Sequence, residues 1–346
     1  MRTAHPRTFC RRSVMRRCRT LAVRALTALG VVIGCCALGS EPLGAQMTPD
    51  SSGYITTADG VRLYYAIHGT AGDTVIVPGG MLLAHELAAL RDNATFVFYD
   101  PRGRGRSDWV ADPKRLTIAH ELRDLEAIRS GLGISRAGLV GFSYLGLVAA
   151  LYAAENPARV ARVALVAPLA PNEQTSSRYA PADGKVRADS AAARLARARA
   201  AAADTADATA ECRRWHQAFL PVYLGDPAAA SQVALDLCSS ENETPTRMQW
   251  RNAQVMRSLP RRWDYSKQAT TIQAPTLVIQ GDKDFIVSPD GARRWAELVP
   301  NARLIMLSGA GHLAFVERRD RVIPALARFF RGDWPPEAMQ LRTSRQ

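Results

Sequence analysis

Short apolar runs alternate with longer amphipathic segments over two parts of the chain, residues 54–168 and 271–332. Alternating polar and apolar positions from Gly53 to Gly69, around the turn at residues 58–60, predict a hairpin of two edge strands. Further strands are predicted at 74–77, 95–99, 137–140, 160–166, 274–280 and 302–307, with helices at 82–91, 116–131, 147–154 and 289–298. This alternation predicts an α/β fold with a doubly wound, mostly parallel sheet that binds ligands beyond the carboxyl ends of its strands.

Residues 168–270 lose the strand periodicity and become rich in alanine and arginine. Helical patterns at 191–203, 206–220 and 248–259 predict a helical insertion, whose arginine-rich faces we interpret as solvated surface. The chain is thus divided into a leader (1–45), a first core part (51–167), the insertion (168–270), a second core part (271–333) and a tail (334–346). We interpret the large side chains of the insertion as core, with pocket lining as the alternative: Trp215, Phe219, Tyr223, Trp250 and Met256.

The formal net charge of +13 belongs mostly to the leader. Residues 1–40 contain eight arginines and neither lysine nor an acidic residue, which leaves +5 (13 − 8) for the remainder and gives no reason to expect a nucleic-acid partner. An arginine-rich start, an apolar run over 25–39 and small residues around Ala45 predict an export signal, too short for a stable membrane span. Four interpretations stay open: cleavage near Ala45, a twin-arginine signal at residues 11–12, a lipobox that would make Cys35 a lipid anchor, and an organelle transit peptide. We expect a periplasmic or secreted protein, or a membrane-anchored lipoprotein.

Cysteine and histidine spacing gives no indication of a metal. Four of the six cysteines lie in the leader, and Cys212 and Cys238 remain either as a disulfide or as two buried thiols. The pairs His85-Glu86 and His120-Glu121 lack the second histidine of a zinc-binding helix. We expect no metal or organic cofactor.

A candidate nucleophile lies at the corner between the strand at 137–140 and the following helix. Ser143, in Gly141-Phe142-Ser143-Tyr144-Leu145-Gly146, occupies a strand-to-helix turn that would expose its hydroxyl; a serine that caps a core helix is the alternative. Leu145 stands where the usual pattern has a second glycine. Earlier in the chain, the strand at 74–77 ends at Gly79-Gly80, where a backbone N–H can approach an anionic oxygen closely.

A carboxylate and a histidine follow the last two predicted strands. Asp284 and His312 complete the chain order Ser, Asp, His, and each lies at the carboxyl end of a strand. Asp282 is the alternative acid, which we interpret as a turn former instead. The histidine would act as the base and the aspartate would orient it.

The segment from Asp100 to Ser107, Asp-Pro-Arg-Gly-Arg-Gly-Arg-Ser, lacks the features of a dinucleotide or phosphate loop. We expect a structural role, with Asp100 paired to Arg102 near the sheet's edge. Together with the Gly-Gly loop and Gly-Phe-Ser-Tyr, this segment resembles the α/β-hydrolase superfamily, and most of all its proline iminopeptidase branch. The resemblance implies an eight-stranded type of sheet with a helical cap, a triad of Ser143, Asp284 and His312, and oxyanion N–H donors at Gly80 and Tyr144. Pro78 departs from the family pattern, which has histidine before the glycines.

These observations predict a serine hydrolase that acts on a small-molecule ester or amide, or on a short peptide. Carboxylesterase and proline iminopeptidase-like peptidase are the leading subclasses, and a cofactor-free perhydrolase would use the same triad. A serine nucleophile argues against haloalkane dehalogenases and epoxide hydrolases, which use aspartate. A non-catalytic ligand-binding protein is the alternative of another class, and the sequence leaves the oligomeric state open. A peptidase would need acidic residues in the insertion to hold the free amine of its substrate, for which the candidates are Glu211, Asp226, Glu241 and Glu243.

Overall fold

A computed structural model describes residues 49–202, 207–233, 237–238 and 240–341. All of these belong to one compact unit, Leu43–Gln346. The predicted export signal, with Ala45 and Cys35, lies outside the described residues. Within the part of the chain that is described, no helix is both long and apolar enough to cross a bilayer.

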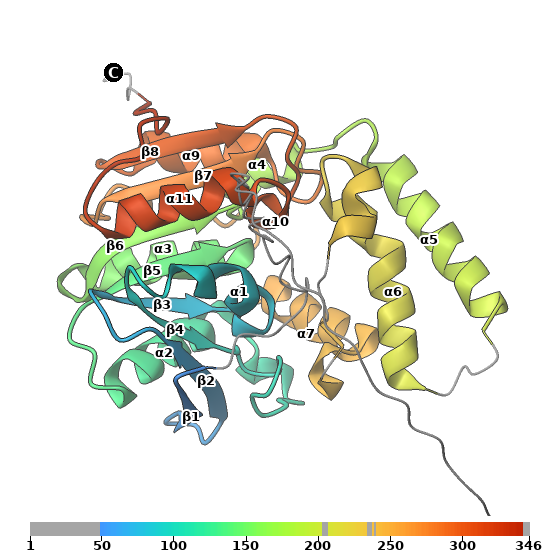
Figure 1. Cartoon of the computed structure of the whole chain (residues 1–346), viewed down its shortest axis with the longest axis horizontal. Coiled ribbons are helices and arrows are strands. Elements are labelled where there is room, and N and C mark those ends of the chain that lie inside the picture. The colour runs from blue at the N-terminus through green and yellow to red at the C-terminus, as the bar shows by residue number, and fades with distance from the viewer. Residues whose placement is uncertain (1–48, 203–206, 234–236, 239, 342–346) are drawn as a thin grey trace, which may run out of the picture. The chain divides into compact units, whose positions relative to one another are not determined.

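Eight strands form one sheet in the order β1-β2-β4-β3-β5-β6-β7-β8 (Figure 1). The first strand pairs antiparallel with the second, the second pairs antiparallel with the fourth, and every other pairing is parallel. The predicted doubly wound, mostly parallel sheet is therefore confirmed. Its strands are β1 (Ser51–Thr56), β2 (Arg62–His68), β3 (Thr74–Pro78), β4 (Thr95–Tyr99), β5 (Ala137–Phe142), β6 (Val160–Val166), β7 (Thr276–Gly281) and β8 (Ala302–Leu307).

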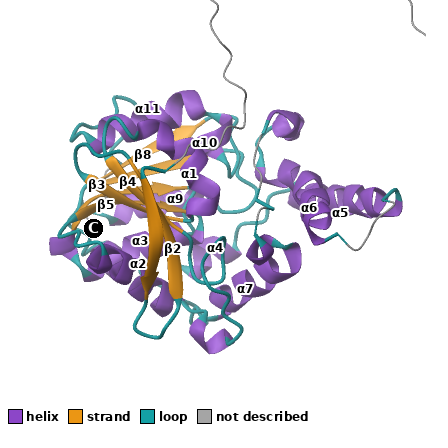
Figure 2. Cartoon of the chain, turned by 60° about the horizontal axis from the view of Figure 1, so that its bottom comes forward, coloured by secondary structure: helices purple, strands orange, loops and turns teal. Residues whose placement is uncertain are grey.

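Helices cover both faces of this sheet (Figures 1 and 2). On one face lie α1 (Gly80–Leu87), which continues into η1 (Ala88–Leu90), and α11 (Arg319–Phe330), which follows the short α10 (Ala314–Glu317). The other face carries α2 (Ile118–Gly131), after the turn η2 (Pro113–Arg115), α3 (Tyr144–Glu155), which leads to η3 (Pro157–Arg159), and α9 (Pro289–Leu298). All six residues of β5 and nine of the twelve in α3 are buried, so this strand and helix form the centre of the apolar core.

Two helices begin earlier than the sequence pattern predicts. Gly79 adopts the left-handed conformation (φ 89°, ψ 38°), which lets α1 start at Gly80 rather than at residue 82. Similarly, β5 extends to Phe142 and α3 begins at Tyr144, so Ser143 alone forms the corner between them.

The helical segment lies between β6 and β7. It contains α4 (Glu173–Ser177), α5 (Gly184–Ala200), α6 (Ala208–Tyr223), η4 (Pro227–Gln232), η5 (Glu241–Glu243), α7 (Pro245–Arg257) and α8 (Ser266–Ala269). Figure 1 shows α5 and α6 side by side beyond the strand ends, with α7 close to the core. A small apolar cluster holds the segment together, formed by Leu195, Trp215, Ala218 and Met248 with Phe219 against it. Its status as a separate domain stays a prediction.

Candidate active site

Ser143 sits on a strained turn between β5 and α3. Its backbone angles, φ 56° and ψ −128°, are costly for a residue with a side chain and persist because the surrounding hydrogen bonds impose them. The Ser143 N–H donates to the carbonyl of Val166 at 3.1 Å, and its own carbonyl accepts from the N–H groups of Gly146 and Leu169 at 3.0 Å each. A Cβ on Gly141 would come within 2.5 Å of the Leu145 carbonyl oxygen, so glycine is required there. The turn forms with Leu145 in place of the usual second glycine.

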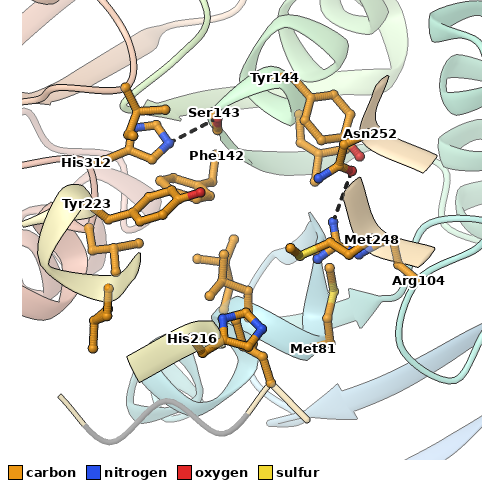
Figure 3. A pocket seen from close by; sticks show the side chains of 18 of the residues that line it. Met81, Arg104, Phe142, Ser143, Tyr144, His216, Tyr223, Met248, Asn252 and His312 are labelled. Carbon is orange, nitrogen blue, oxygen red and sulfur yellow. Dashed lines mark hydrogen bonds between the residues drawn. The ribbon is translucent and has the colours of Figure 1, made fainter. Parts of the chain in front are cut away.

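His312 and Asp284 converge on this serine from the last two strands. His312 Nε2 lies 3.1 Å from Ser143 Oγ, and His312 Nδ1 lies 2.8 Å from Asp284 Oδ2 (Figure 3). Both partners are buried, at 2% and 0% exposure. The three side chains therefore form a continuous hydrogen-bonded relay from the carboxylate to the hydroxyl.

The Asp284 carboxylate is fixed by several donors. Its Oδ1 accepts from the backbone N–H groups of Ile286 and Val287 at 2.8 and 3.0 Å, and Oδ2 accepts from Gln280 Nε2 at 2.9 Å. Asp282, the alternative acid, accepts from the N–H of Gly309 at 2.7 Å and is exposed. The structure thus places Asp284 against His312 and Asp282 in the neighbouring turn.

Gln280 cannot be recognised from the sequence alone, because one polar residue near the end of an apolar strand has no distinctive pattern. Its only signal is its position directly before Gly281-Asp282, at the carboxyl end of β7.

The loop before α1 leaves one backbone N–H without an acceptor among the described residues. Pro78 has no N–H, that of Gly79 donates to the Tyr99 carbonyl at 2.9 Å, and that of Met81 donates to Asp100 Oδ1 at 2.8 Å. Gly80 carries the remaining N–H group. Tyr144 is likewise the first residue of its helix, where N–H groups lack intrahelical partners.

Gly80 packs tightly, because a Cβ there would meet Phe98 at 3.1 Å. It lines a small cavity of about 170 Å³ together with Met81, which also lines the larger one that contains Ser143.

A cavity of about 1150 Å³ opens between the strand ends and the helical segment (Figure 3). Ser143 and His312 lie on its core side, and α1 and α7 contribute mainly apolar side chains to its other walls. The helix α6 contributes both apolar and polar side chains, namely Trp215, Leu220 and Tyr223, and Arg213, His216 and Gln217. Three of the large side chains of the helical segment, Trp215, Tyr223 and Met256, line this cavity, as in the alternative interpretation from the sequence. Phe219 instead stacks on Trp215, and Trp250 packs against Trp109.

No acidic side chain is among the described residues that line the large cavity. The acidic candidates of the helical segment are engaged elsewhere. Glu243 binds Arg104, Glu211 binds Arg199 and Arg214, Glu241 binds Arg247, and Asp226 caps η4 through the N–H of Ala228.

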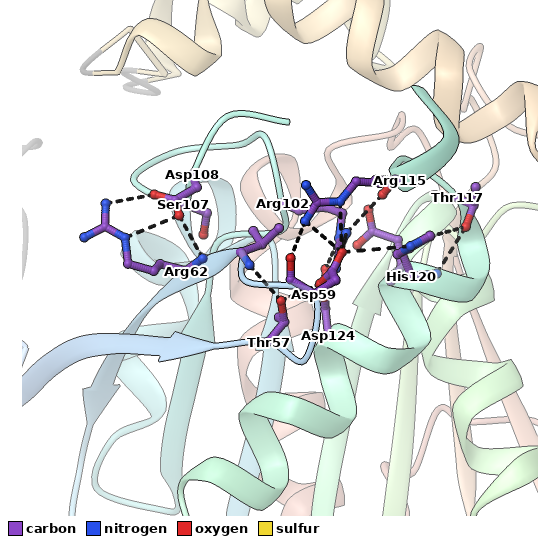
Figure 4. A network of polar contacts seen from close by, with 12 residues as sticks. Thr57, Asp59, Arg62, Arg102, Ser107, Asp108, Arg115, Thr117, His120 and Asp124 are labelled. Carbon is purple, nitrogen blue, oxygen red and sulfur yellow. Dashed lines mark hydrogen bonds and ion pairs between the residues drawn. The ribbon is translucent and has the colours of Figure 1, made fainter. Parts of the chain in front are cut away.

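The predicted pairing of Asp100 with Arg102 is wrong. Asp100 Oδ2 accepts from the N–H of Arg106 at 2.8 Å while Oδ1 accepts from Met81, so backbone groups use the carboxylate. Arg102 is buried and points to the other side, where Nε donates to Asp124 at 2.6 Å and Nη1 to Asp59 at 3.0 Å (Figure 4). A buried guanidinium needs more acceptors than one already occupied carboxylate offers, and these two aspartates supply them.

The pKa values of Asp100 and of Asp59, which lies in the turn between β1 and β2, are shifted in opposite directions. Desolvation raises the pKa of Asp100 to about 6, because its two backbone donors compensate only part of the cost. Partial burial of Asp59 acts the same way, but hydrogen bonds from Arg102, Thr57 and Arg115 outweigh it and lower the pKa of Asp59.

Comparison with known proteins agrees with this fold. The sequence model of the α/β-hydrolase fold family matches residues 66–319. The chain belongs to this family. RutD of Caulobacter sp., for which a carbamate hydrolase activity is proposed, is 27% identical to this α/β-hydrolase over 290 residues, 80% of this chain and 98% of RutD. A proline iminopeptidase of Saccharolobus solfataricus is 35% identical over 103 residues, which cover 27% of this chain and 33% of that protein.

One relative is far longer than this chain. The polyketide synthase ThaQ of Burkholderia thailandensis is 27% identical over 84% of the α/β-hydrolase chain, which spans only 13% of the length of ThaQ. Among solved structures, the esterase RhEst1 of Rhodococcus sp. superposes with a TM-score of 0.62 at 23% identity, over 82% of this chain and 99% of the esterase. The family and its named relatives support a hydrolase function.

Proposed function

We propose that the protein is a serine hydrolase that cleaves a small-molecule ester, with an amide as the related alternative. The observation that carries this proposal is the relay from Asp284 through His312 to Ser143. A serine hydroxyl is a weak nucleophile at neutral pH, so His312 takes its proton during attack on the substrate carbonyl. Asp284 holds the imidazole with Nδ1 protonated and stabilises the imidazolium that forms.

Two backbone groups are proposed to stabilise the negative oxygen that forms on attack. The N–H groups of Gly80 and Tyr144 begin α1 and α3 and donate to no described residue. Helix N-termini favour negative charge, and one such donor is typically worth about 3 kcal/mol of the barrier. His312 then returns its proton to the departing alcohol, and water hydrolyses the ester formed on Ser143.

The described lining of the large cavity favours an ester over the amino terminus of a peptide. An aminopeptidase has to compensate a substrate ammonium group, and no acidic side chain is among the described lining residues. The carboxylate of Glu243, which is paired with the lining residue Arg104, is already bound by that arginine and by the N–H of Gly105. The named relatives include an esterase and a proposed carbamate hydrolase, which fits a neutral carbonyl substrate.

The test is covalent labelling of the purified protein with a fluorophosphonate, followed by peptide mass spectrometry. We expect one adduct on Ser143, no adduct in Ser143→Ala, and slow labelling in His312→Ala. Turnover of p-nitrophenyl butyrate and of proline p-nitroanilide then separates the subclasses, and we expect the ester to be strongly preferred. An intact folded protein that neither labels nor hydrolyses either compound would refute the proposal and favour a binding protein on the same fold.

A further inference from the structure

One wall of the large cavity is formed by α7, and three side chains that offer hydrogen-bond donors meet there. They are Arg104 from the loop after β4, Tyr144 from α3 and Asn252 from α7 (Figure 3). They come from three distant parts of the sequence, and neither the relay nor the proposed oxyanion donors use their side chains.

The orientation of the Asn252 amide is determined by two arginines. Its Oδ1 accepts from Arg251 Nη1 at 3.3 Å and from Arg104 Nη1 at 3.5 Å. Guanidinium groups can only donate, so the oxygen of the amide has to face them. The NH₂ group is then directed away from both arginines, and it donates to no described residue. Figure 3 shows it on the side of the open cavity.

Tyr144 is constrained in the same way. Its hydroxyl oxygen accepts from Arg251 Nη1, which leaves the hydroxyl hydrogen without an acceptor among the described residues. Burial raises the pKa of Tyr144 to about 12, so the phenol keeps this hydrogen at neutral pH. Tyr144 therefore contributes a second donor at the cavity wall.

Arg104 supplies a third donor while its charge is compensated. Its Nε and Nη2 bind the two oxygens of Glu243 at 2.8 and 2.7 Å. Its Nη1 donates one hydrogen to Asn252 Oδ1 and carries a second one. Arg251, the other cation of this wall, is fully buried and bound to Glu121. Both arginines are thus paired with a carboxylate, and the wall is rich in donors but close to electrically neutral.

We propose that Asn252, Tyr144 and Arg104 form a subsite for a carbonyl oxygen of the substrate, distinct from the carbonyl that Ser143 attacks. This proposal rests on the proposed hydrolase function and names its substrate class: an ester that carries a second, neutral carbonyl group on an otherwise apolar chain. The apolar side chains that α1 and α7 contribute to the lining accommodate that chain. A buried donor left without an acceptor is costly, so a substrate without this oxygen should be discriminated against.

The experiment compares matched esters that differ by one oxygen. On the acyl side, p-nitrophenyl esters of methyl-ketone acids of increasing length are paired with the alkanoates of equal length. On the alcohol side, oxoalkyl acetates are paired with alkyl acetates. In the series that reaches the subsite, we expect kcat/KM to favour the ketone at least tenfold, which corresponds to about 1.4 kcal/mol.

Asn252→Asp is the decisive variant, because it keeps an oxygen for both arginines and replaces the donating NH₂ group by an acceptor. We expect it to abolish the ketone preference and Tyr144→Phe to weaken it. Gln249→Glu, the same amide-to-carboxylate change at an exposed position of the same helix that does not line the cavity, should leave the ratio as in the wild type. Calorimetry should show the same preference when these esters bind to Ser143→Ala, which cannot turn them over.

Each outcome has a distinct meaning. Equal kcat/KM values within every pair, or a ketone preference that Asn252→Asp leaves intact, would overturn the subsite while alkyl ester turnover and Ser143 labelling still support the hydrolase. A stronger gain for acids that end in a carboxylate would overturn its neutral character. Absence of both labelling and turnover would remove the proposed function itself.

Discussion

Arg104 and Glu243 join the core to the helical segment through two hydrogen bonds of 2.7–2.8 Å. Both side chains are buried, and Glu243 also accepts from the N–H of Gly105 at 2.8 Å. Next to it, Asn242 donates to the carbonyls of Gly105 and Ser107. The turn η5 is therefore bound to the loop after β4, and this contact holds α7 beside the cavity.

Glu243→Gln should strongly destabilise the protein. The substitution leaves a buried guanidinium without its counter-charge, and loss of one partner from such a pair typically costs about 3–5 kcal/mol. Urea unfolding measures this change. Glu241→Gln is the matched control two residues away, because Glu241 forms an exposed pair with Arg247 that should be worth less than about 1 kcal/mol. Equal effects of the two substitutions would show that the buried pair does not stabilise the contact.

Asp100 should make stability depend on pH. The carboxyl has an ordinary pKa of 3.8 and titrates at about 6 in the folded protein, so between these values the folded state binds a proton that the unfolded state has released. Stability from this group is therefore lost as pH rises from about 4 to about 6, by roughly 3 kcal/mol. The unfolding free energy of the wild type minus that of Asp100→Asn, measured by urea denaturation, should therefore be smaller at pH 7 than at pH 4.5. A difference that is constant over this range contradicts the shifted titration.

Local patterns predicted most of the fold. Buried strands such as β6 and β8 were recognised at their full extent because a short apolar run between turn residues admits few other structures. The order of Ser143, Asp284 and His312 was readable because each follows a strand, and parallel strands bring their carboxyl ends to one edge of the sheet.

Contacts between distant segments could not be predicted in this way. The partners of Arg102 lie 43 and 22 residues away, and Asp100 was the nearer but wrong choice. Asn252 had no signal at all, because its orientation depends on Arg104, which lies 148 residues earlier. The extra turn of α3 was missed because tertiary hydrogen bonds, not local propensity, impose the positive φ of Ser143.

The disulfide between Cys212 and Cys238 should stabilise the helical segment. The two Cα atoms lie 5.7 Å apart with a sequence separation of 26 residues, and closing a loop of this length is worth about 3.5 kcal/mol in the chain-entropy model. Replacing both cysteines by serine should lower the urea midpoint, and Trp215, on the same helix as Cys212, should report the change by fluorescence. Dithiothreitol should shift the wild type toward the variant and leave the variant unaffected. If the variant unfolds at the same midpoint as the oxidised wild type, the crosslink adds no stability, and the contact between η5 and the core loop is sufficient to hold the segment.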